Sequence, residues 1–256
     1  MTNQWNQFET ADYDGMICET ISIDGYNGEK INAYYARPLG PGPFPGVVLI
    51  HHLPGWDEFY REMTRRFAQH GYAAISPNHY AHFGYGTPDD AAARARGAGG
   101  ISDDAIVGDC ETAASFLRAQ PYTTDKVGLI GTCSGGRHTY VTIGRSNDFN
   151  AAVICWPGGV VQDEVTPQRP VSPIELTPNV KTPILGLFGN DDQNPPPAMV
   201  DQLEAALKQQ GKQYEFHRYD GAGHGIFYYQ TPLYRQQQAM DCWSKIFTFF
   251  GQNLVG

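Results

Sequence analysis

Hydrophobic and polar residues alternate in two short runs near the start of the chain. The runs cover residues 17–23 and 30–37, and the glycines of the intervening segment, residues 24–28, permit a tight reversal. This pattern predicts an antiparallel hairpin. After a proline-containing segment, residues 46–50 form a continuous apolar run, which is typical of a strand buried on both faces of a parallel sheet.

Helix and strand patterns alternate from this run to the end of the chain. Apolar side chains first recur every three or four residues at Trp56, Phe59, Met63 and Phe67, and Gly71 ends that helix. Later helices are expected after Ser102, after Pro197 and around Trp243, and strands at residues 73–76, 127–130, 151–156, 183–188 and 214–219. The sequence therefore predicts an α/β fold in one domain, residues 1–256, with a mostly parallel, doubly wound sheet, an N-terminal antiparallel hairpin and helices on both faces. Ligands of such sheets bind at the carboxyl ends of the strands.

Charge and cysteine content narrow the classes of partner. The chain carries 18 Lys and Arg against 27 Asp and Glu, a net charge of −9, which disfavours nucleic acid and anionic membranes as partners. Without a signal-peptide pattern or an apolar run long enough to span a membrane, a soluble, cytoplasmic protein is expected. The cysteines are odd in number and contain no C-x-x-C pair, so free thiols are expected at Cys18, Cys110, Cys133, Cys155 and Cys242.

The segment VGLIGTCSGG, residues 127–136, predicts a strand, a sharp turn and a helix. Glycines two residues before and two after Cys133 are typical of a nucleophile elbow, where the strained turn leaves no room for neighbouring β-carbons. A thiolate there is favoured by the helix N-terminus, and the N–H of Ser134 can point at an oxyanion. Two alternatives stay open: Cys133 as a buried structural residue, and Ser134 as the nucleophile, although Thr132 then occupies a position that favours a small residue. A phosphate-binding loop is excluded because neither a Walker lysine nor G-x-G-x-x-G spacing is present.

A base and an acid follow the nucleophile in the chain order of an α/β-hydrolase. The predicted strand at residues 214–219 leads into DGAGHG, which places His224 in a loop between glycines. We interpret His224 as the base, and the alternative is an exposed loop histidine. The strand at residues 183–188 leads into GNDD, where Asp192 is preferred as the acid and Asp191 is expected to cap the loop backbone.

These motifs resemble those of the dienelactone hydrolase family. The resemblance rests on GTCSGG, GNDD and GAGHG, and on the segments at residues 61–67, 71–74 and 77–80, and it covers the chain from about Ile17 to the C-terminus. It implies an α/β-hydrolase fold and a Cys133-Asp192-His224 triad that cleaves an ester or lactone through an acyl-thiol intermediate. It also implies oxyanion donors at Ser134 and Leu53, and neither a metal nor an organic cofactor.

The chain departs from the family pattern at three positions where the family has charged side chains. The family's best-known members have a glutamate near the resting thiol where this chain has His52, and two arginines where it has His82 and Tyr228. These departures argue against dienelactone itself as the substrate. His52 is expected either near Cys133, where it would assist proton removal or bind substrate, or as a polar strand-end residue. Arg137 is expected to hold an anionic substrate group or to form a structural salt bridge.

Aromatic residues gather near the predicted strand ends. A subset that lines the pocket would favour a flat, aryl or unsaturated substrate, with Trp56, Tyr80, Trp156 and Tyr228 as candidates. His79 and His82 have metal-ligand spacing, but no third ligand stands nearby, so no metal is expected.

The sequence predicts a hydrolase of activated esters, enol lactones or thioesters that acts on a small molecule as a monomer or homodimer. Two alternatives use the same pocket. One is an isomerase or lyase that adds the thiol to a conjugated substrate, and the other is a binding protein without turnover.

Overall fold

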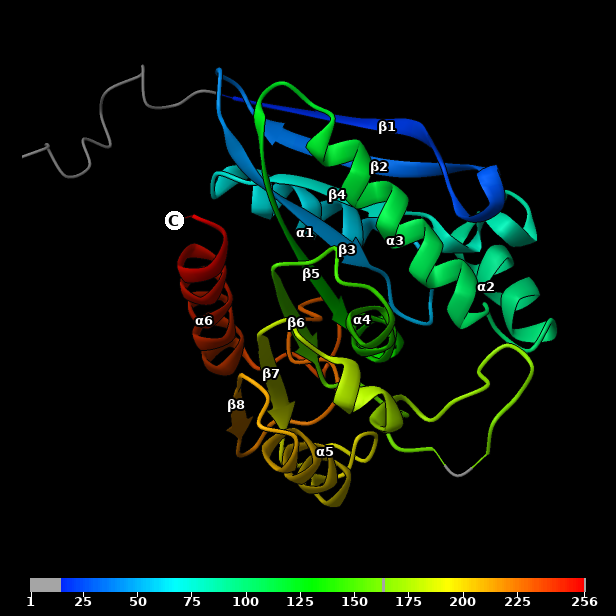
Figure 1. The fold of residues 1–256 in the computed structure, drawn as a ribbon, viewed down its shortest axis with the longest axis vertical. Coiled ribbons are helices and arrows are strands. Elements are labelled where there is room, and N and C mark those ends of the chain that lie inside the picture. The colour runs from blue at the N-terminus through cyan, green and yellow to red at the C-terminus, as the bar shows by residue number, and fades with distance from the viewer. Residues whose placement is uncertain (1–14, 163, 256) are drawn as a thin grey trace, which may run out of the picture.

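The computed structural model describes residues 15–162 and 164–255. These residues form an eight-stranded sheet in the order β1-β2-β4-β3-β5-β6-β7-β8 (Figure 1). The strands are β1 (Met16–Asp24), β2 (Lys30–Pro38), β3 (Phe44–Ile50), β4 (Ala73–Pro77), β5 (Thr123–Thr132), β6 (Ala151–Cys155), β7 (Ile184–Gly189) and β8 (Tyr214–Tyr219). Strand β2 pairs antiparallel with β1 and with β4, and the other pairings are parallel. The predicted sheet with its N-terminal hairpin is confirmed.

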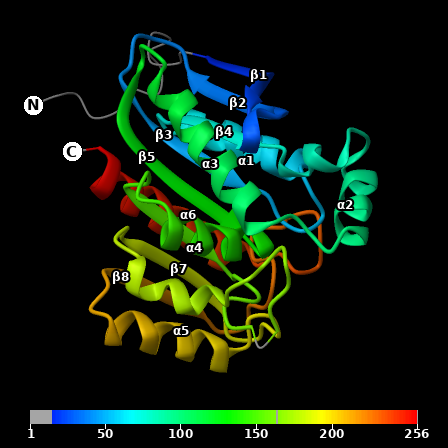
Figure 2. The ribbon, with the colours of Figure 1, turned by 45° about the vertical axis from the view of Figure 1, so that its right-hand side comes forward.

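Helices cover both faces of the sheet, as predicted (Figure 2). One face carries α1 (Glu58–Gln69) and α6 (Gln236–Leu254), and the other carries α3 (Asp103–Arg118), α4 (Ser134–Arg145) and α5 (Pro197–Gln209). Within the described ranges, no helix is sufficiently long and apolar to cross a membrane.

Strand β3 packs against both helical layers because successive side chains of a strand point to opposite faces. Val47 and Leu49 belong to the hydrophobic cluster that includes α1 and α6 residues, whereas Val48 and Ile50 belong to the cluster of the opposite face. All four side chains are fully buried. This explains why the segment has no polar position.

Several short elements were not predicted from the sequence. They are the helix α2 (Pro88–Gly97) and the 3₁₀ turns η2 (Tyr26–Gly28), η3 (His79–Phe83) and η4 (Pro173–Asn179). Helix α2 begins where the Thr87 side chain accepts a hydrogen bond from the Asp90 backbone N–H at 3.2 Å, with Pro88 at a first helical position. Its buried face consists of alanines, so it lacks the contrast between large apolar and polar residues that reveals a helix in a sequence.

The loops at the carboxyl ends of the parallel strands carry the candidate site residues. His51 and His52 follow β3, Cys133 follows β5 and Trp156 follows β6. Asp192 lies shortly after β7, and His224 lies shortly after β8. Neighbouring parallel strands end at the same edge, so residues far apart in the chain converge there.

Candidate active site

Cys133 lies at the sharp turn between β5 and α4, with φ 56° and ψ −125°. A positive φ is uncommon outside glycine and stores backbone strain. The flanking glycines permit this turn, because a β-carbon on Gly131 would lie 2.2 Å from the carbonyl oxygen of Gly135, and one on Gly135 would lie 2.2 Å from that of Ile50. The sulfur-bearing residue is half-buried at the start of a helix. This is the backbone geometry of a nucleophile elbow.

Two loops bring Asp192 and His224 together. A β-carbon on Gly189 would lie 2.3 Å from the Ala222 carbonyl oxygen, so only glycine lets the loops approach this closely. The backbone N–H of Asp191 donates to the same oxygen at 2.9 Å. His224 Nδ1 lies 2.9 Å from Asp192 Oδ2, whereas the Asp191 side chain is exposed. The structure therefore places Asp192 against the imidazole.

The surroundings of His224 stabilise an imidazolium that stands beside an ionised sulfur. Burial acts against the imidazolium charge, but the hydrogen bond to the Asp192 carboxylate and the interaction with an ionised Cys133 outweigh it, and together they raise the pKa of His224 to about 10. Asp192 is almost fully buried and its other oxygen accepts the Asn194 backbone N–H at 2.8 Å. The imidazole thus contacts a fixed carboxylate, and its proton affinity rises when Cys133 loses its proton.

Leu53 and Ser134, the residues predicted to supply oxyanion donors, follow the neighbouring strands β3 and β5. Ser134 is the first residue of α4, where backbone N–H groups have no partner within the helix. Leu53 lies in the turn after β3, and its carbonyl oxygen accepts the Tyr80 hydroxyl at 3.2 Å.

His52 is buried, and both of its ring nitrogens have partners. Nε2 lies 2.8 Å from Asp57 Oδ2, and Nδ1 lies 2.9 Å from the Tyr228 hydroxyl. The Tyr228 hydroxyl also lies 3.0 Å from the Thr132 hydroxyl, which in turn lies 2.7 Å from that of Tyr60. His52 therefore reaches the elbow through Tyr228 and not by direct contact of a ring nitrogen with the sulfur.

Aromatic rings form one wall beside the triad. The Trp156 ring is fully buried and lies edge-on to His224, Phe227 and Tyr228, with centroid distances of 6.4, 4.9 and 6.1 Å. A hollow of about 230 Å³ adjoins this wall on the far side of Tyr228. Its lining includes His52, Pro54, Asp57, Phe59 and Tyr228.

Two predicted substrate-binding residues have their polar groups engaged elsewhere. The Trp56 indole N–H donates to the Ser76 carbonyl oxygen at 2.9 Å. Both ring nitrogens of His82 are occupied by the carboxylates of Glu29 and Asp109. We therefore do not place Trp56 or His82 in the proposed site.

Arg137 forms a buried salt bridge. Its guanidinium contacts both oxygens of Asp103, at 2.6 and 3.2 Å, and both side chains are almost fully buried. Of the two roles expected for Arg137, the contacts favour the structural one.

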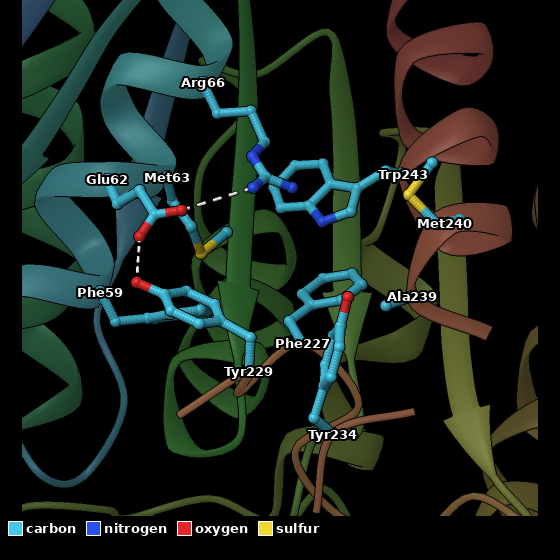
Figure 3. Close-up of a pocket in the computed structure, with 10 residues that line it drawn as sticks. All are labelled: Phe59, Glu62, Met63, Arg66, Phe227, Tyr229, Tyr234, Ala239, Met240 and Trp243. Atoms are coloured by element: carbon cyan, nitrogen blue, oxygen red, sulfur yellow. Dashed lines mark hydrogen bonds and ion pairs between the residues drawn. The ribbon is translucent and has the colours of Figure 1, made fainter. Parts of the chain in front are cut away.

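A second hollow of about 260 Å³ lies between α1 and α6 (Figure 3). Glu62 accepts the Tyr229 hydroxyl and contacts Arg66 at 3.4 Å, and the Arg66 guanidinium lies 4.7 Å from the Trp243 ring centroid. Phe227 is stacked on Trp243 at 4.9 Å. Phe227 thus separates this hollow from Trp156 and the triad.

Sequence reasoning missed Asp57, Thr132 and Tyr60 as site residues, and Asp109 as a partner of histidines. A usable signal existed for Asp57, which immediately precedes a predicted helix and accepts the Tyr60 backbone N–H as its N-cap.

In residues 15–162 and 164–255, no three His, Cys, Asp or Glu side chains are grouped to hold a metal ion.

A model of the dienelactone hydrolase family matches residues 31–254. The chain belongs to the dienelactone hydrolase family. As a member of that family, it is a hydrolase that acts on ester or lactone bonds. The family resemblance predicted from the sequence is confirmed. The crystal structure of a dienelactone hydrolase-like protein from Klebsiella pneumoniae, titled "Putative Dienelactone Hydrolase", matches with a TM-score of 0.86 and 27% identity, over 93% of this chain and 100% of that one.

Two relatives extend the family match along the chain. A Methylorubrum extorquens protein named "Putative carboxymethylenebutenolidase" is 30% identical over 245 residues, which are 94% of this chain and 83% of the relative. A Bradyrhizobium protein named "Probable 2-oxo-3-(5-oxofuran-2-ylidene)propanoate lactonase" is 26% identical over 251 residues, 94% of this chain and 98% of the relative. In both comparisons the similarity thus covers 94% of this chain.

Proposed function

We propose that this family member cleaves a small activated ester, enol lactone or thioester through an acyl-enzyme formed on Cys133. The observation that carries the proposal is the convergence of Cys133, His224 and Asp192 after β5, β8 and β7, with His224 Nδ1 2.9 Å from Asp192 Oδ2 and Cys133 among the groups that raise the pKa of the imidazole. His224 takes the thiol proton as the sulfur attacks the carbonyl carbon, and the buried Asp192 carboxylate stabilises the imidazolium that forms.

The oxyanion of the tetrahedral adduct is assigned to the backbone N–H groups of Ser134 and Leu53. Imidazolium His224 then donates its proton to the departing alkoxide, enolate or thiolate. In the second half of the reaction, neutral His224 removes a proton from water, which attacks the acyl-thiol carbon and releases the acid and the Cys133 thiol. Each proton taken by the imidazole is returned, so the enzyme is regenerated.

Chemistry and pocket shape favour activated substrates. A thiolate leaves a tetrahedral adduct more readily than an alkoxide does, so the adduct collapses forward only when the substrate carries a good leaving group. The partly exposed Tyr228 ring, backed by the fully buried Trp156 ring that lies edge-on to His224, supplies a flat apolar wall, which suits an aryl or unsaturated acyl group. The relatives named for butenolide and furanylidene lactones support the lactone class.

The proposal is tested with a panel of aryl esters, enol lactones and thioesters, using wild-type protein and Cys133→Ala. Wild-type protein should turn over at least one class, and intact mass measured after rapid quenching should show one acyl group on Cys133. The variant should show neither. Incorporation of ¹⁸O from labelled water into the acid product would support hydrolysis over isomerisation. Turnover that survives in Cys133→Ala, or a permanent adduct without turnover, would contradict the proposal.

A further inference from the structure

A third hollow, of about 320 Å³, opens beside Trp56, a residue that the proposed catalytic site does not use. This volume suits a small molecule. The lining comes from β1, β2, the end of β4, the start of α1 and the loop between η3 and α2, and it includes Thr20, Asn32, Trp56, Arg61, Asn78 and Tyr85. None of these residues belongs to the proposed triad or to the aromatic wall beside it.

The sheet supplies three polar side chains to the hollow. The backbone N–H of Asn78 donates to the carbonyl oxygen of Asn32 at 2.7 Å, so these two residues lie side by side. Thr20 is two residues from Ser22, the cross-strand partner of Asn32, and alternate residues of a strand share one face of the sheet. Two carboxamides and a hydroxyl thus offer both donors and acceptors to a ligand.

Among the described residues that line the hollow, Arg61 alone is charged. Its guanidinium lies 4.7 Å from the ring centroid of Trp56, whose indole N–H is in turn bonded to the Ser76 carbonyl oxygen. Its buried Nε has no hydrogen-bond partner within the described ranges. Stacking therefore holds the cation at the hollow without satisfying its hydrogen-bonding capacity, which is unusual for a buried donor.

The carboxylate nearest to Arg61 is already shared. Glu58 Oε1 accepts a hydrogen bond from Arg65 at 2.7 Å, whereas Glu58 Oε2 lies 3.9 Å from Arg61 Nη1, which is beyond hydrogen-bond distance. One carboxylate thus faces two guanidinium groups. A positive charge remains at the hollow.

A second arginine of α1 stacks on a tryptophan in the same way, but it has a carboxylate of its own. The Arg66 guanidinium lies 4.7 Å from the Trp243 ring centroid and contacts Glu62 at 3.4 Å (Figure 3). Arg61 lies at the same distance from Trp56, and in the described part of the chain its ion-pair contact is the longer one to Glu58. The comparison indicates that the hollow beside Trp56 is suited to an anion from outside the chain.

We propose that this hollow binds a small hydroxycarboxylate, whose carboxylate contacts Arg61 and whose hydroxyl groups contact Asn32 and Asn78. A guanidinium binds a carboxylate by paired, charge-assisted hydrogen bonds, and carboxamides both donate to hydroxyl groups and accept from them. The rings of Trp56 and the exposed Tyr85 supply apolar surface for the carbon chain of the ligand. The site is independent of the proposed acyl-enzyme.

Three probes with six carbons each separate the parts of this recognition. D-Gluconate carries a carboxylate and hydroxyl groups, sorbitol carries hydroxyl groups alone, and hexanoate carries a carboxylate alone. The indole N–H signal of Trp56 in ¹H–¹⁵N NMR spectra reports binding, and its loss in Trp56→Phe assigns it. Gluconate should shift this signal saturably, and sorbitol and hexanoate should bind about tenfold more weakly or less, as expected when one charge-assisted or several neutral hydrogen bonds are lost.

Variants assign each part of the ligand to a side chain. Arg61→Gln should weaken gluconate binding about tenfold or more and leave sorbitol binding unchanged, because only the carboxylate loses its partner. Asn78→Ala should weaken the binding of gluconate and sorbitol but not that of hexanoate. Arg66→Gln is the matched control on the same helix and should change none of the three affinities. Arg61→Lys keeps the charge without the planar fork and should give a smaller loss, which provides a second test if the glutamine variant folds poorly.

The outcomes decide between a ligand site and a hollow that holds only water. The absence of a saturable shift of the Trp56 signal with gluconate, or an equal gluconate affinity in Arg61→Gln and wild type, would overturn the inference. Equal binding of gluconate and hexanoate would overturn the assignment of a hydroxycarboxylate. Cys133→Ala should bind gluconate as wild type does, so failure of the proposed function and failure of this site are distinguishable.

Discussion

The Nδ1 atom of His52 lies 2.9 Å from the hydroxyl of Tyr228, although 176 residues separate them in the chain. Both residues stand at positions where the best-known members of the family carry charged side chains. The two departures are thus hydrogen-bond partners of each other.

Asp192→Asn should reduce kcat by about 100-fold or more on any substrate identified for the wild type. Asparagine cannot stabilise the imidazolium and favours the wrong imidazole tautomer, so His224 becomes a poor acceptor of the thiol proton. Asp191→Asn is the matched control, because its side chain is exposed on the same loop. Steady-state kinetics give kcat for both variants. An equal reduction of kcat in Asp192→Asn and Asp191→Asn would show that Asp192 is not the acid of the triad.

Gly135→Ala should destabilise the fold by about 1–3 kcal/mol or more, the range found for overpacked sites. The added β-carbon would lie 2.2 Å from the Ile50 carbonyl oxygen, so the elbow must move away from β3. Gly251→Ala provides the contrast: it lies in α6 with open space around its β-carbon, and should stabilise by about 0.5–1 kcal/mol. Urea unfolding of both variants measures the difference. A neutral Gly135→Ala would contradict the requirement for glycine at the elbow.

Local patterns in the sequence were sufficient for most of the sheet. The strand predicted at residues 214–219 coincides with β8, and the hairpin differs from β1 and β2 by one residue at three of its four ends. Strands in this fold are short apolar or alternating runs between turn residues, so the local sequence is sufficient to place them. Helix α2 was missed because its buried residues are alanines.

The candidate site was only partly predictable from the sequence. Cys133 and His224 stand out because each has glycine neighbours and lies shortly after a predicted strand. The bond between His52 and Tyr228 depends on how distant loops pack, and no local pattern encodes that packing. Asp109 is a fully buried acid on an otherwise apolar helix face, and only the folded chain reveals the histidines that compensate its charge.

Asp109→Asn should destabilise the protein most between about pH 4 and pH 6.5. Burial opposes the Asp109 charge, but hydrogen bonds from His79 and His82 outweigh it and lower its pKa to about 2. The bond to Asp109 is the main cause that raises the pKa of His82 to about 9, aided by Glu29 and opposed by burial. The stabilisation from the acid is therefore complete above the unfolded pKa near 4 and is lost as pH falls through about 2. The stabilisation that protonated His82 contributes is complete below about pH 6.5 and is lost as pH rises through about 9.

Urea unfolding of wild type and Asp109→Asn at pH 5.5 and pH 9.5 checks this dependence. A gap of up to about 3 kcal/mol is expected at the lower pH, since the variant removes the buried carboxylate that holds the His82 cation and leaves it only the exposed Glu29. The gap should narrow at pH 9.5, where His82 has lost its proton. A gap that is constant over this range would show that Asp109 acts by packing and backbone bonds, such as the one it accepts from the Tyr26 N–H at 2.8 Å.

Arg137→Ala should cost about 3–5 kcal/mol of folding free energy, because it leaves the buried Asp103 carboxylate without its partner. Arg145→Ala is the matched control on the same helix, since its ion pair with Asp104 is partly exposed and should contribute less than about 1 kcal/mol. Urea unfolding measures both, and a Michaelis constant measured below the unfolding transition separates the two roles expected for Arg137. If Arg137→Ala leaves stability unchanged and raises KM for anionic substrates alone, the residue binds substrate and the buried pair is secondary.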